Sequence, residues 1–220
     1  MALRTPKDLY QYRGHKRTTA PATEPVSAAE LRSYLVESAS SLLDAEANAL
    51  VTEARQMIED ATGLALVTQS WTLALDHWPM QRAEWWDGVR QGSIADLYGG
   101  HGELQLPRFP LQSLTSVKVY DEDSTEVVVG DIFDVDTFRT PGRITLKVGQ
   151  TWPIALRSSN AIIIEYVAGY GDAADVPATL KRAVKQVAAY LYSHKGDDCI
   201  PDNALMQARS LLSGYIVARL

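Results

Sequence analysis

The spacing of apolar residues changes twice along this chain, and this change constrains the fold more than any single motif. Over residues 44–62 apolar side chains recur every three or four positions, which indicates an amphipathic helix with Gly63 as its C-cap. Over residues 67–75 they alternate with a period of two, which indicates a strand. The helical spacing returns over residues 180–191. The sequence therefore predicts helices, then strands, then helices again.

Shorter signals complete the helical parts. Ser27 is followed three residues later by Glu30, a capping-box pattern that predicts a short helix over residues 27–38. A last helix is predicted over about residues 202–213, after a break at Gly196. The polar face of the helix over residues 44–62 carries four charged residues: Glu46, Glu53, Arg55 and Glu59.

Short β segments follow one another between residues 103 and 167, with no predicted helix among them. They cover residues 103–106, 114–120, 126–129, 132–135, 143–148 and 161–167. The second and third of these, joined by an acidic turn, have the strongest hairpin pattern. We therefore expect an α+β fold. Residues 25–64 and 176–220 supply helices to a small bundle, and residues 65–175 form an inserted, mainly antiparallel β domain.

Two segments do not fit this regular outline. Residues 80–102 form a long, glycine-containing loop, in which Trp85 and Trp86 either pack on the β domain or offer anchors to a partner. Residues 1–24 form a basic arm, although the whole chain has a formal net charge of −6. The arm is predicted to be flexible; ordering on a partner or contact with phosphate is the open alternative. Its cationic residues are Arg4, Lys7, Arg13, Lys16 and Arg17.

Residues 169–174 partly match the dinucleotide-binding turn G-x-G-x-x-A. The second strand of a parallel βαβ unit is not predicted, and Asp172 and Asp175 would repel a pyrophosphate. We instead expect Asp175 to cap the next helix, with Pro177 in its first turn. Three glycines are then candidate hinges between the β domain and the bundle: Gly63, Gly169 and Gly171.

Residue types that perform catalysis or bind metals form no recognisable group. The four histidines are scattered, and the single cysteine, Cys199, has no C-x-x-C partner. Asp131, Asp134 and Asp136 alternate along a predicted strand, where their charges would discourage edge pairing. We predict no catalytic, cofactor-binding or metal-binding residues, and we expect no enzyme activity. No apolar run approaches the roughly 18 residues of a membrane span, so no association with a membrane is expected.

Several segments occur in a familiar order: EPVSAAELRSYL, LVTEARQMIEDATGLALVTQSWTLALDHWP, LQLPRFPLQSLTSVKVYDED, GQTWP and IIIEYVAGYGDAADVPATLKRAVKQVAAYLY. Together they resemble the head–tail connector proteins, also called adaptor or head-completion proteins, of long-tailed bacteriophages and gene transfer agents. The resemblance covers about residues 24–195. The basic arm and the loop over residues 80–102 are additions to the usual pattern, and the end of the chain after residue 196 matches only loosely.

The resemblance implies a structural virion protein, assembled in the host cytoplasm, without catalysis or cofactor. Connector proteins form a ring, typically of twelve subunits, between the portal protein and a stopper or tail-side neck protein. DNA passes through the lumen of that ring without sequence-specific binding. The C-terminal segment commonly docks on the portal. The matching candidates in this chain are Leu211, Leu212, Tyr215, Ile216, Val217 and Leu220.

Two other interpretations stay open at this point. The chain could be another neck or tail-completion protein, because modules of helices and strands recur among those proteins. A nucleotide-binding enzyme that uses residues 169–174 is the second alternative, and the missing second strand argues against it.

Overall fold

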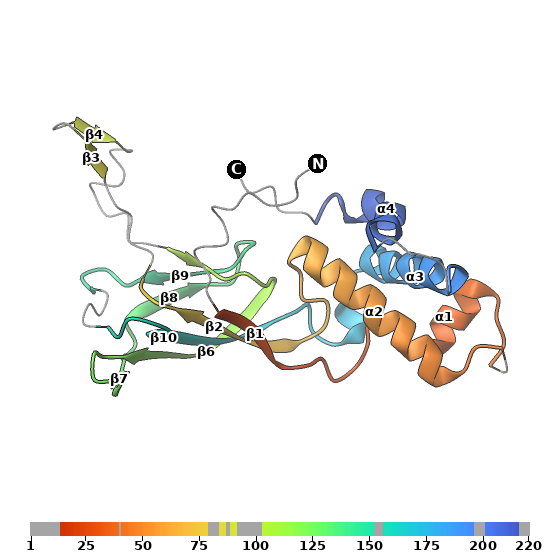
Figure 1. Ribbon diagram of the computed structural model, residues 1–220, viewed down its shortest axis with the longest axis horizontal. Helices are drawn as coiled ribbons and strands as arrows, with labels where there is room; N and C mark the ends of the chain where they lie inside the picture. Colours follow the sequence, from red (N-terminus) through yellow and green to blue (C-terminus); the bar gives the residue numbers. More distant parts are fainter. Residues whose placement is uncertain are drawn as a thin grey trace. The chain divides into compact units, whose positions relative to one another are not determined.

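A computed structural model describes residues 14–39, 41–78, 84–86, 89–91, 103–151, 156–195 and 201–215 (Figure 1). The chain divides into two compact units, and each is described by itself. Residues 20–69, 107–110 and 168–220 form what we call the helical unit, and residues 1–19, 70–106 and 111–167 form the β unit. The fold is α+β, as predicted from the sequence. Residues 65–69, 107–110 and 168–175, which lie in the range expected for the β domain, group with the helical unit.

The helical unit contains α1 (Ala28–Leu35), α2 (Asp44–Thr62), α3 (Ala178–Ser193) and α4 (Pro201–Leu212). The capping box at the start of α1 is confirmed: the Ser27 hydroxyl accepts from the Glu30 N–H at 3.2 Å, and the Glu30 carboxylate accepts from the Ser27 N–H at 2.8 Å. Gly63 ends α2 with a φ of 81°, as its glycine signal predicted.

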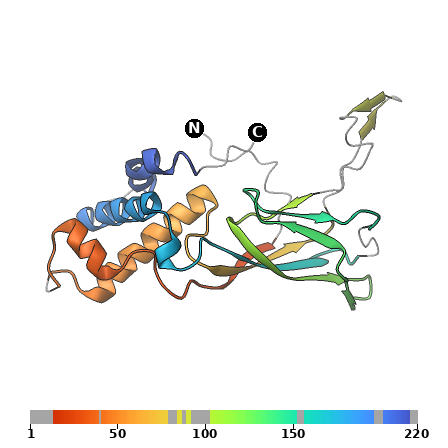
Figure 2. The same cartoon turned by 180° about the vertical axis from the view of Figure 1, so that it is seen from behind.

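The four helices share one apolar core. In Figures 1 and 2, α3 lies between α1 and α4, and α3 packs against α1, α2 and α4. Side chains without solvent exposure come from all four helices and include Leu31, Val51, Ile58, Val184 and Ala208. Spacings of three and four residues on each helix direct these side chains to one side, which is why the helical period was readable in the sequence.

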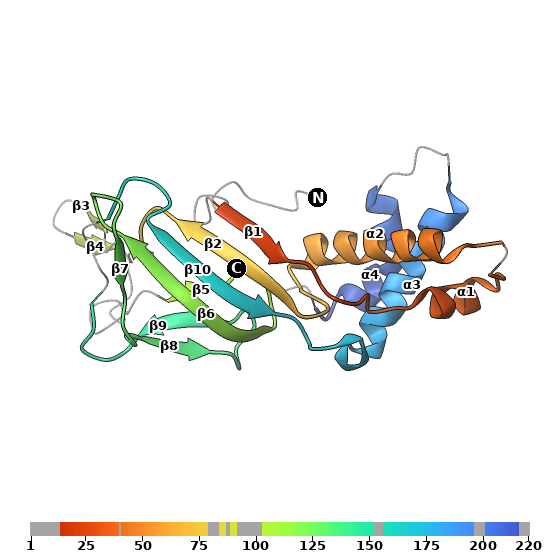
Figure 3. The same ribbon diagram turned by 90° about the horizontal axis from the view of Figure 1, so that it is seen from below.

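The described residues of the β unit form three sheets. The largest has five strands in the order β1-β2-β10-β6-β7, and β10 runs opposite to both neighbours in Figure 3. A three-stranded sheet has the order β5-β9-β8, and β3 pairs with β4. The bounds are β1 Gly14–Thr19, β2 Gln69–Leu75, β3 Glu84–Trp86, β4 Val89–Gln91, β5 Leu104–Gln105, β6 Leu111–Tyr120, β7 Glu126–Val128, β8 Phe133–Asp136, β9 Arg143–Leu146 and β10 Ile162–Ala168.

Alternation within the central strands builds the core of the β unit. Every second residue of β2 and of β10 is buried, so one face of each strand is apolar and covered. Trp78 and Phe133, which follow β2 and begin β8, place their rings 5.8 Å apart. The predicted hairpin is confirmed, because β6 and β7 pair antiparallel with Tyr120 opposite Glu126.

Four expectations from the sequence were wrong. Gly14–Thr19 is not part of a flexible arm but forms β1, which pairs antiparallel with β2. The segment over residues 80–102 is not irregular throughout, because it includes the β3–β4 pair. Asp175 does not cap α3; it ends a 3-10 turn over Ala173–Asp175, and Pro177 occupies the N-cap position rather than the first turn. Arg55 and Glu59 are buried rather than part of a solvated polar face.

Candidate assembly surfaces

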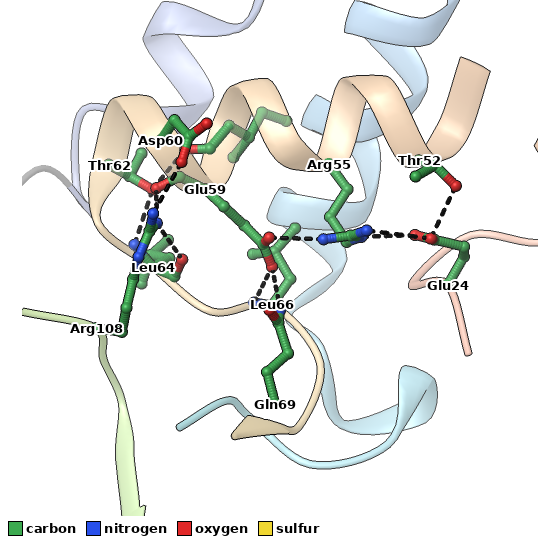
Figure 4. A network of polar contacts seen from close by, with 11 residues as sticks. Glu24, Thr52, Arg55, Glu59, Asp60, Thr62, Leu64, Leu66, Gln69 and Arg108 are labelled. Carbon is green, nitrogen blue, oxygen red and sulfur yellow. Dashed lines mark hydrogen bonds and ion pairs between the residues drawn. The ribbon is translucent and has the colours of Figure 1, made fainter. Parts of the chain in front are cut away.

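A buried ionic network holds three chain segments of the helical unit together (Figure 4). Arg55 on α2 is 2% exposed and lies between two carboxylates. Its Nε donates to Glu24 and its Nη1 donates to Glu59, each at 2.7 Å. Thr52 donates its hydroxyl to Glu24 at 2.9 Å. The network therefore fastens the segment that precedes α1 onto α2.

Glu59 extends this network to the segment that follows α2. Its second carboxylate oxygen accepts from the Leu66 N–H at 2.9 Å and from the Gln69 side-chain amide at 2.6 Å. Burial alone would lower the pKa of Arg55, but the hydrogen bonds and charges of Glu24 and Glu59 outweigh burial and raise that pKa above its usual value. Because each charge has partners within the chain, the network fixes these segments relative to one another.

Arg108 secures the end of α2 in a second way. Its guanidinium donates to the Glu59 carbonyl at 2.6 Å and pairs with the Asp60 carboxylate at 2.8 Å (Figure 4). A cation at this end complements the helix dipole. It is also a second donor to the Glu59 carbonyl, which already accepts from the Gly63 N–H at 2.9 Å. The segment over residues 107–110 is thereby held against the same helix end as Gly63, which lies next to the ring of Phe109.

The candidate hinge glycines occupy backbone conformations that other residues rarely adopt. Gly169 and Gly171 have φ values of 138° and 132°. A Cβ on Gly169 would lie 2.6 Å from the Val67 carbonyl oxygen, and a Cβ on Gly171 would lie 2.4 Å from the Asp175 carboxylate. The interpretation of these glycines as backbone turns is confirmed. Whether the chain bends at Gly63, Gly169 or Gly171 stays a prediction.

The same turn argues against a phosphate cradle. The Asp175 carboxylate accepts a hydrogen bond from the Asp172 N–H at 2.9 Å, so the chain's own anion occupies a donor that a phosphate would need. The strand before the turn, β10, has antiparallel neighbours on both sides (Figure 3). A dinucleotide site requires a parallel βαβ unit, and the described strands of this sheet do not form one.

The C-terminal candidates divide into two groups. Leu212 is 2% exposed and belongs to the core of the helical unit, while Leu211 and Tyr215 are partly buried against it. Burial, with a smaller contribution from the nearby Tyr215, raises the pKa of Tyr170. Ile216, Val217 and Leu220 lie outside the described residues. Of the described candidates, Leu212 already packs within its own bundle, so its proposed contact with a portal would require α4 to move.

The remaining candidates are placed only in part. Lys16 and Arg17 lie on β1, with Lys16 exposed and Arg17 partly buried. Arg4, Lys7 and Arg13 lie outside the described residues. Trp85 and Trp86 lie on β3, and the positions of their side chains are also outside what the structure describes.

Several large apolar side chains face solvent, and sequence analysis selected none of them. Tyr34, Val36 and Leu43 lie at the end of α1 and in the connection to α2, and Met206 lies on α4. Phe138 and Val148 are similarly exposed in the β unit. Isolated exposed apolar residues are ordinary, but clusters of them often mark contacts with a partner. The sequence does not distinguish these exposed residues from core residues, because the same apolar residue types occur at both kinds of position.

The described part of the chain offers few groups that could bind a metal ion or a ligand. No group of three or more His, Cys, Asp or Glu side chains there could hold a metal ion. An open depression in the β unit lies between the turn at Glu122 and Ser124 and residues 156–160, and polar groups line most of it. Among the described helices, none is long and apolar enough to cross a membrane.

Comparison with known proteins yields matches among solved structures. No protein-family model matches the sequence, and no curated protein does. A chain in the neck of an empty gene transfer agent particle, computed with C6 symmetry, has a TM-score of 0.73 and 20% sequence identity, over 94% of this chain and 97% of that chain. A chain from the virion of a native gene transfer agent particle has a TM-score of 0.70 and 21% identity, over 94% and 96%.

A third match comes from the neck of a native gene transfer agent particle computed with C12 symmetry. Its TM-score is 0.64 and its identity is 22%, over 94% of this chain and 97% of that chain. At such identities the likeness establishes a shared fold. Because it spans nearly the full length of both chains, the shared fold includes both the helical unit and the β unit.

Proposed function

We propose that this chain is a structural virion protein of the head–tail connector, or adaptor, type. It forms a ring in the neck of a phage-like or gene transfer particle, between the portal and a stopper or tail-side protein. The observation that carries this proposal is the near full-length fold likeness to neck chains of gene transfer agent particles. The ordered segments over residues 24–195 support it independently, because they point to connector proteins from sequence alone.

The internal chemistry of the chain supports a structural role. The most buried charged groups, Arg55 and Glu59, are engaged with one another and with neighbouring segments. A fold that fixes its segments in this way suits a subunit that must keep its shape while transmitting force between neighbouring rings. In a symmetric particle, each subunit presents complementary surfaces to its neighbours. Exposed apolar side chains on both units of this chain are available for such contacts.

A position between the portal and the tail determines which proteins this chain would contact. The ring has twelve copies, in line with the C12 symmetry used for one of the matching necks. The C-terminal segment docks on the portal, and the β3–β4 region with Trp85 and Trp86 contacts a neighbouring protein. The net charge of −6 suits a lumen through which DNA slides, because phosphate contacts would otherwise supply strong non-specific binding.

A reconstruction of the assembled neck tests this proposal. The full-length chain is mixed with the portal protein of the same particle and imaged by electron microscopy. We expect a ring of this chain directly below the portal. A ring further down, or density only at the tail end, would identify another neck or tail-completion protein instead.

Calorimetry with a panel of nucleotides separates the proposal from an enzyme of another class. The connector should give no heat of specific binding with any nucleotide. Micromolar binding of a dinucleotide that is lost in Gly171→Val would favour the nucleotide-binding alternative.

A further inference from the structure

Val36 combines two unfavourable features in one residue. It follows the last residue of α1 and has φ 61° and ψ 34°, the left-handed helical conformation. Two further non-glycine residues in the described part of the chain have positive φ, Ser124 and Asn160. Both are polar, and asparagine in particular tolerates this conformation. A β-branched residue does not, and the Val36 side chain is also 91% exposed.

The same chain shows what folding alone would favour at such a position. The residue that ends α2 in the left-handed conformation is Gly63, the residue type that helix ends usually select there. Glycine at position 36 would remove both the backbone strain and the exposed apolar surface. Strain of this kind often persists where it serves a function, so Val36 is a candidate contact residue.

Hydrogen bonds hold the described residues that follow α1. The Val36 and Glu37 N–H groups both donate to the Arg32 carbonyl, as expected at a capped helix end. The Ser41 hydroxyl donates to the Glu37 carboxylate at 2.7 Å. A surface that is already ordered loses little conformational entropy on binding, which favours its use as a contact.

Two neighbouring leucines of the connection to α2 differ in exposure: Leu42 is buried and Leu43 faces solvent. Leu42 has no solvent exposure and anchors the connection in the core of the helical unit. Leu43 is 64% exposed. The neighbouring Asp44 carboxylate is also largely exposed, and its Oδ1 pairs with Arg32 of the same chain at 2.5 Å. Tyr34, Val36 and Leu43 are the exposed apolar residues at the end of α1 and before α2, and we call these three residues, with their acidic neighbour Asp44, the α1 tip.

A complementary surface exists on α4. Met206 is 62% exposed, and Arg209 lies three residues later on the same exposed face. Methionine adapts its shape to apolar partners. The Arg209 cation complements the exposed Asp44 carboxylate as a second cation beside Arg32. The α1 tip and this face of α4 cannot meet within one bundle, because α3 separates α1 from α4 (Figures 1 and 2).

We propose that the α1 tip of one copy of this chain packs on the Met206 face of α4 of the next copy. A closed ring needs two different surfaces on each subunit, and these two lie on different sides of the same bundle. The inference rests on the proposed function, since it names the contact that joins neighbouring subunits of the ring. In this proposal, the exposed side of α4 contacts a second copy of the chain, while its buried side, with Leu212, packs in the core of its own helical unit.

Cross-linking between different copies tests the contact directly. Two full-length variants are made in a Cys199→Ser background, one with Val36→Cys and the other with Met206→Cys. The two are mixed with the portal protein and oxidised. A disulfide between them requires Cβ atoms about 4 Å apart on different chains. We expect mixed dimers of Val36→Cys with Met206→Cys to dominate.

A matched control uses an apolar residue that is fully exposed in the β unit. Phe138→Cys replaces Val36→Cys in an otherwise identical mixture. Mixed dimers at the same yield in this control, or none between Val36→Cys and Met206→Cys, would overturn the proposal. If the wild-type chain does not assemble with the portal, the proposed function fails. In that case, the two variants are oxidised at high concentration without the portal protein. The yield of mixed dimers, compared with the Phe138→Cys control, then tests the contact between copies.

A polar substitution separates contact from fold. Val36→Asn introduces a residue that tolerates the left-handed conformation better than valine, so its melting temperature should equal or exceed that of the wild type. Its ring assembly, measured by native mass spectrometry, should weaken about tenfold, the loss that corresponds to one well-packed contact residue. Unchanged assembly, or a loss of assembly that only follows a lower melting temperature, would contradict the inference. Loss of portal binding without loss of self-contact would assign the α1 tip to the portal instead.

Discussion

The Nε atom of Arg55 donates to the carboxylate of Glu24 at 2.7 Å, across 31 positions of sequence. This contact fixes the segment before α1 against the middle of α2. Since Arg55 also donates to the buried Glu59, one side chain joins the entry and the exit of the α1–α2 pair. Networks of this kind are costly to break, because each remaining charge is left buried without its partner.

Replacing Arg55 by methionine should therefore destabilise the helical unit strongly. We expect Arg55→Met to lower the free energy of unfolding by about 3–5 kcal/mol, the range for removing one partner of a buried pair. Urea unfolding followed by far-UV circular dichroism measures the loss. Lys195→Met is the matched control, since Lys195 pairs with Glu46 on the surface of the same unit. That control should cost about 1 kcal/mol or less.

The prediction fails if the two variants unfold at similar urea concentrations. A further variant combines Arg55→Met with Glu24→Gln and Glu59→Gln. It should recover part of the stability, because neutral side chains no longer leave buried charges unpaired.

Gly169 should tolerate no larger residue. We expect Gly169→Ala to lower the free energy of unfolding by about 2 kcal/mol or more, since a strained φ and a close contact with the Val67 backbone act together. Gly214→Ala in the same unit is the control, because a Cβ there meets no atom within 4 Å. A melting temperature of Gly169→Ala equal to that of the control would contradict this prediction and would show that the backbone relaxes easily at this turn, as a hinge requires.

The sequence predicted those elements whose signals are local. α2 was predicted with its bounds, because its apolar period is long and Gly63 marks its end. The β6–β7 hairpin was predicted for the same reason, with alternation on both sides of a polar turn. β1 was missed, since Gly-His-Lys-Arg-Thr-Thr carries no alternating apolar residues and becomes a strand only by pairing with β2.

The candidate surfaces were harder to predict than the fold. Arg55 lay on the expected polar face of α2, and only the folded arrangement of Glu24 and Gln69 turns that face inward. Val36 carries no glycine or asparagine signal for a left-handed helix end, so its strain is visible only in the backbone angles. The Arg55 case depends on contacts between segments that are far apart in the sequence, whereas the Val36 case depends on a local backbone conformation that the residue type does not indicate.

Acid should weaken the β unit through Glu103. Hydrogen bonds from Gln105 and Arg143, together with the charges of Arg139 and Arg143, lower the pKa of Glu103 below its usual value of 4.5. The folded state therefore gains stability from this carboxylate above pH 4.5 and loses it as the pH falls through the lower folded pKa. We expect Glu103→Gln to be less stable than the wild type at pH 7, and the difference should shrink below pH 4.5.

Tryptophan fluorescence measures this pH dependence in the β unit, because all five tryptophans of the chain fall in its segments. Asp134→Asn, which removes an exposed carboxylate on the neighbouring strand β8, serves as the control. A stability difference between Glu103→Gln and the wild type that stays constant from pH 7 to pH 3 would contradict the assignment.

Removal of the C-terminal end should separate folding from portal binding. Deletion of Ser213–Leu220 removes the partly buried Tyr215 but keeps Leu212, which is the buried anchor of α4. We therefore expect the shortened chain to retain its helical circular dichroism, with a modest loss of stability. Binding to the portal protein, measured by co-sedimentation, should be lost because the proposed docking residues Tyr215, Ile216, Val217 and Leu220 are gone.

Leu212→Ala provides the opposite case. Truncation of a fully packed leucine costs about 2–5 kcal/mol, so this variant should loosen α4 while the segment after it remains intact. If the C-terminal segment docks by itself, Leu212→Ala retains portal binding in spite of its lower stability. If docking uses the packed form of α4, portal binding falls together with stability. Full portal binding by the deletion variant would refute a C-terminal docking segment in either form.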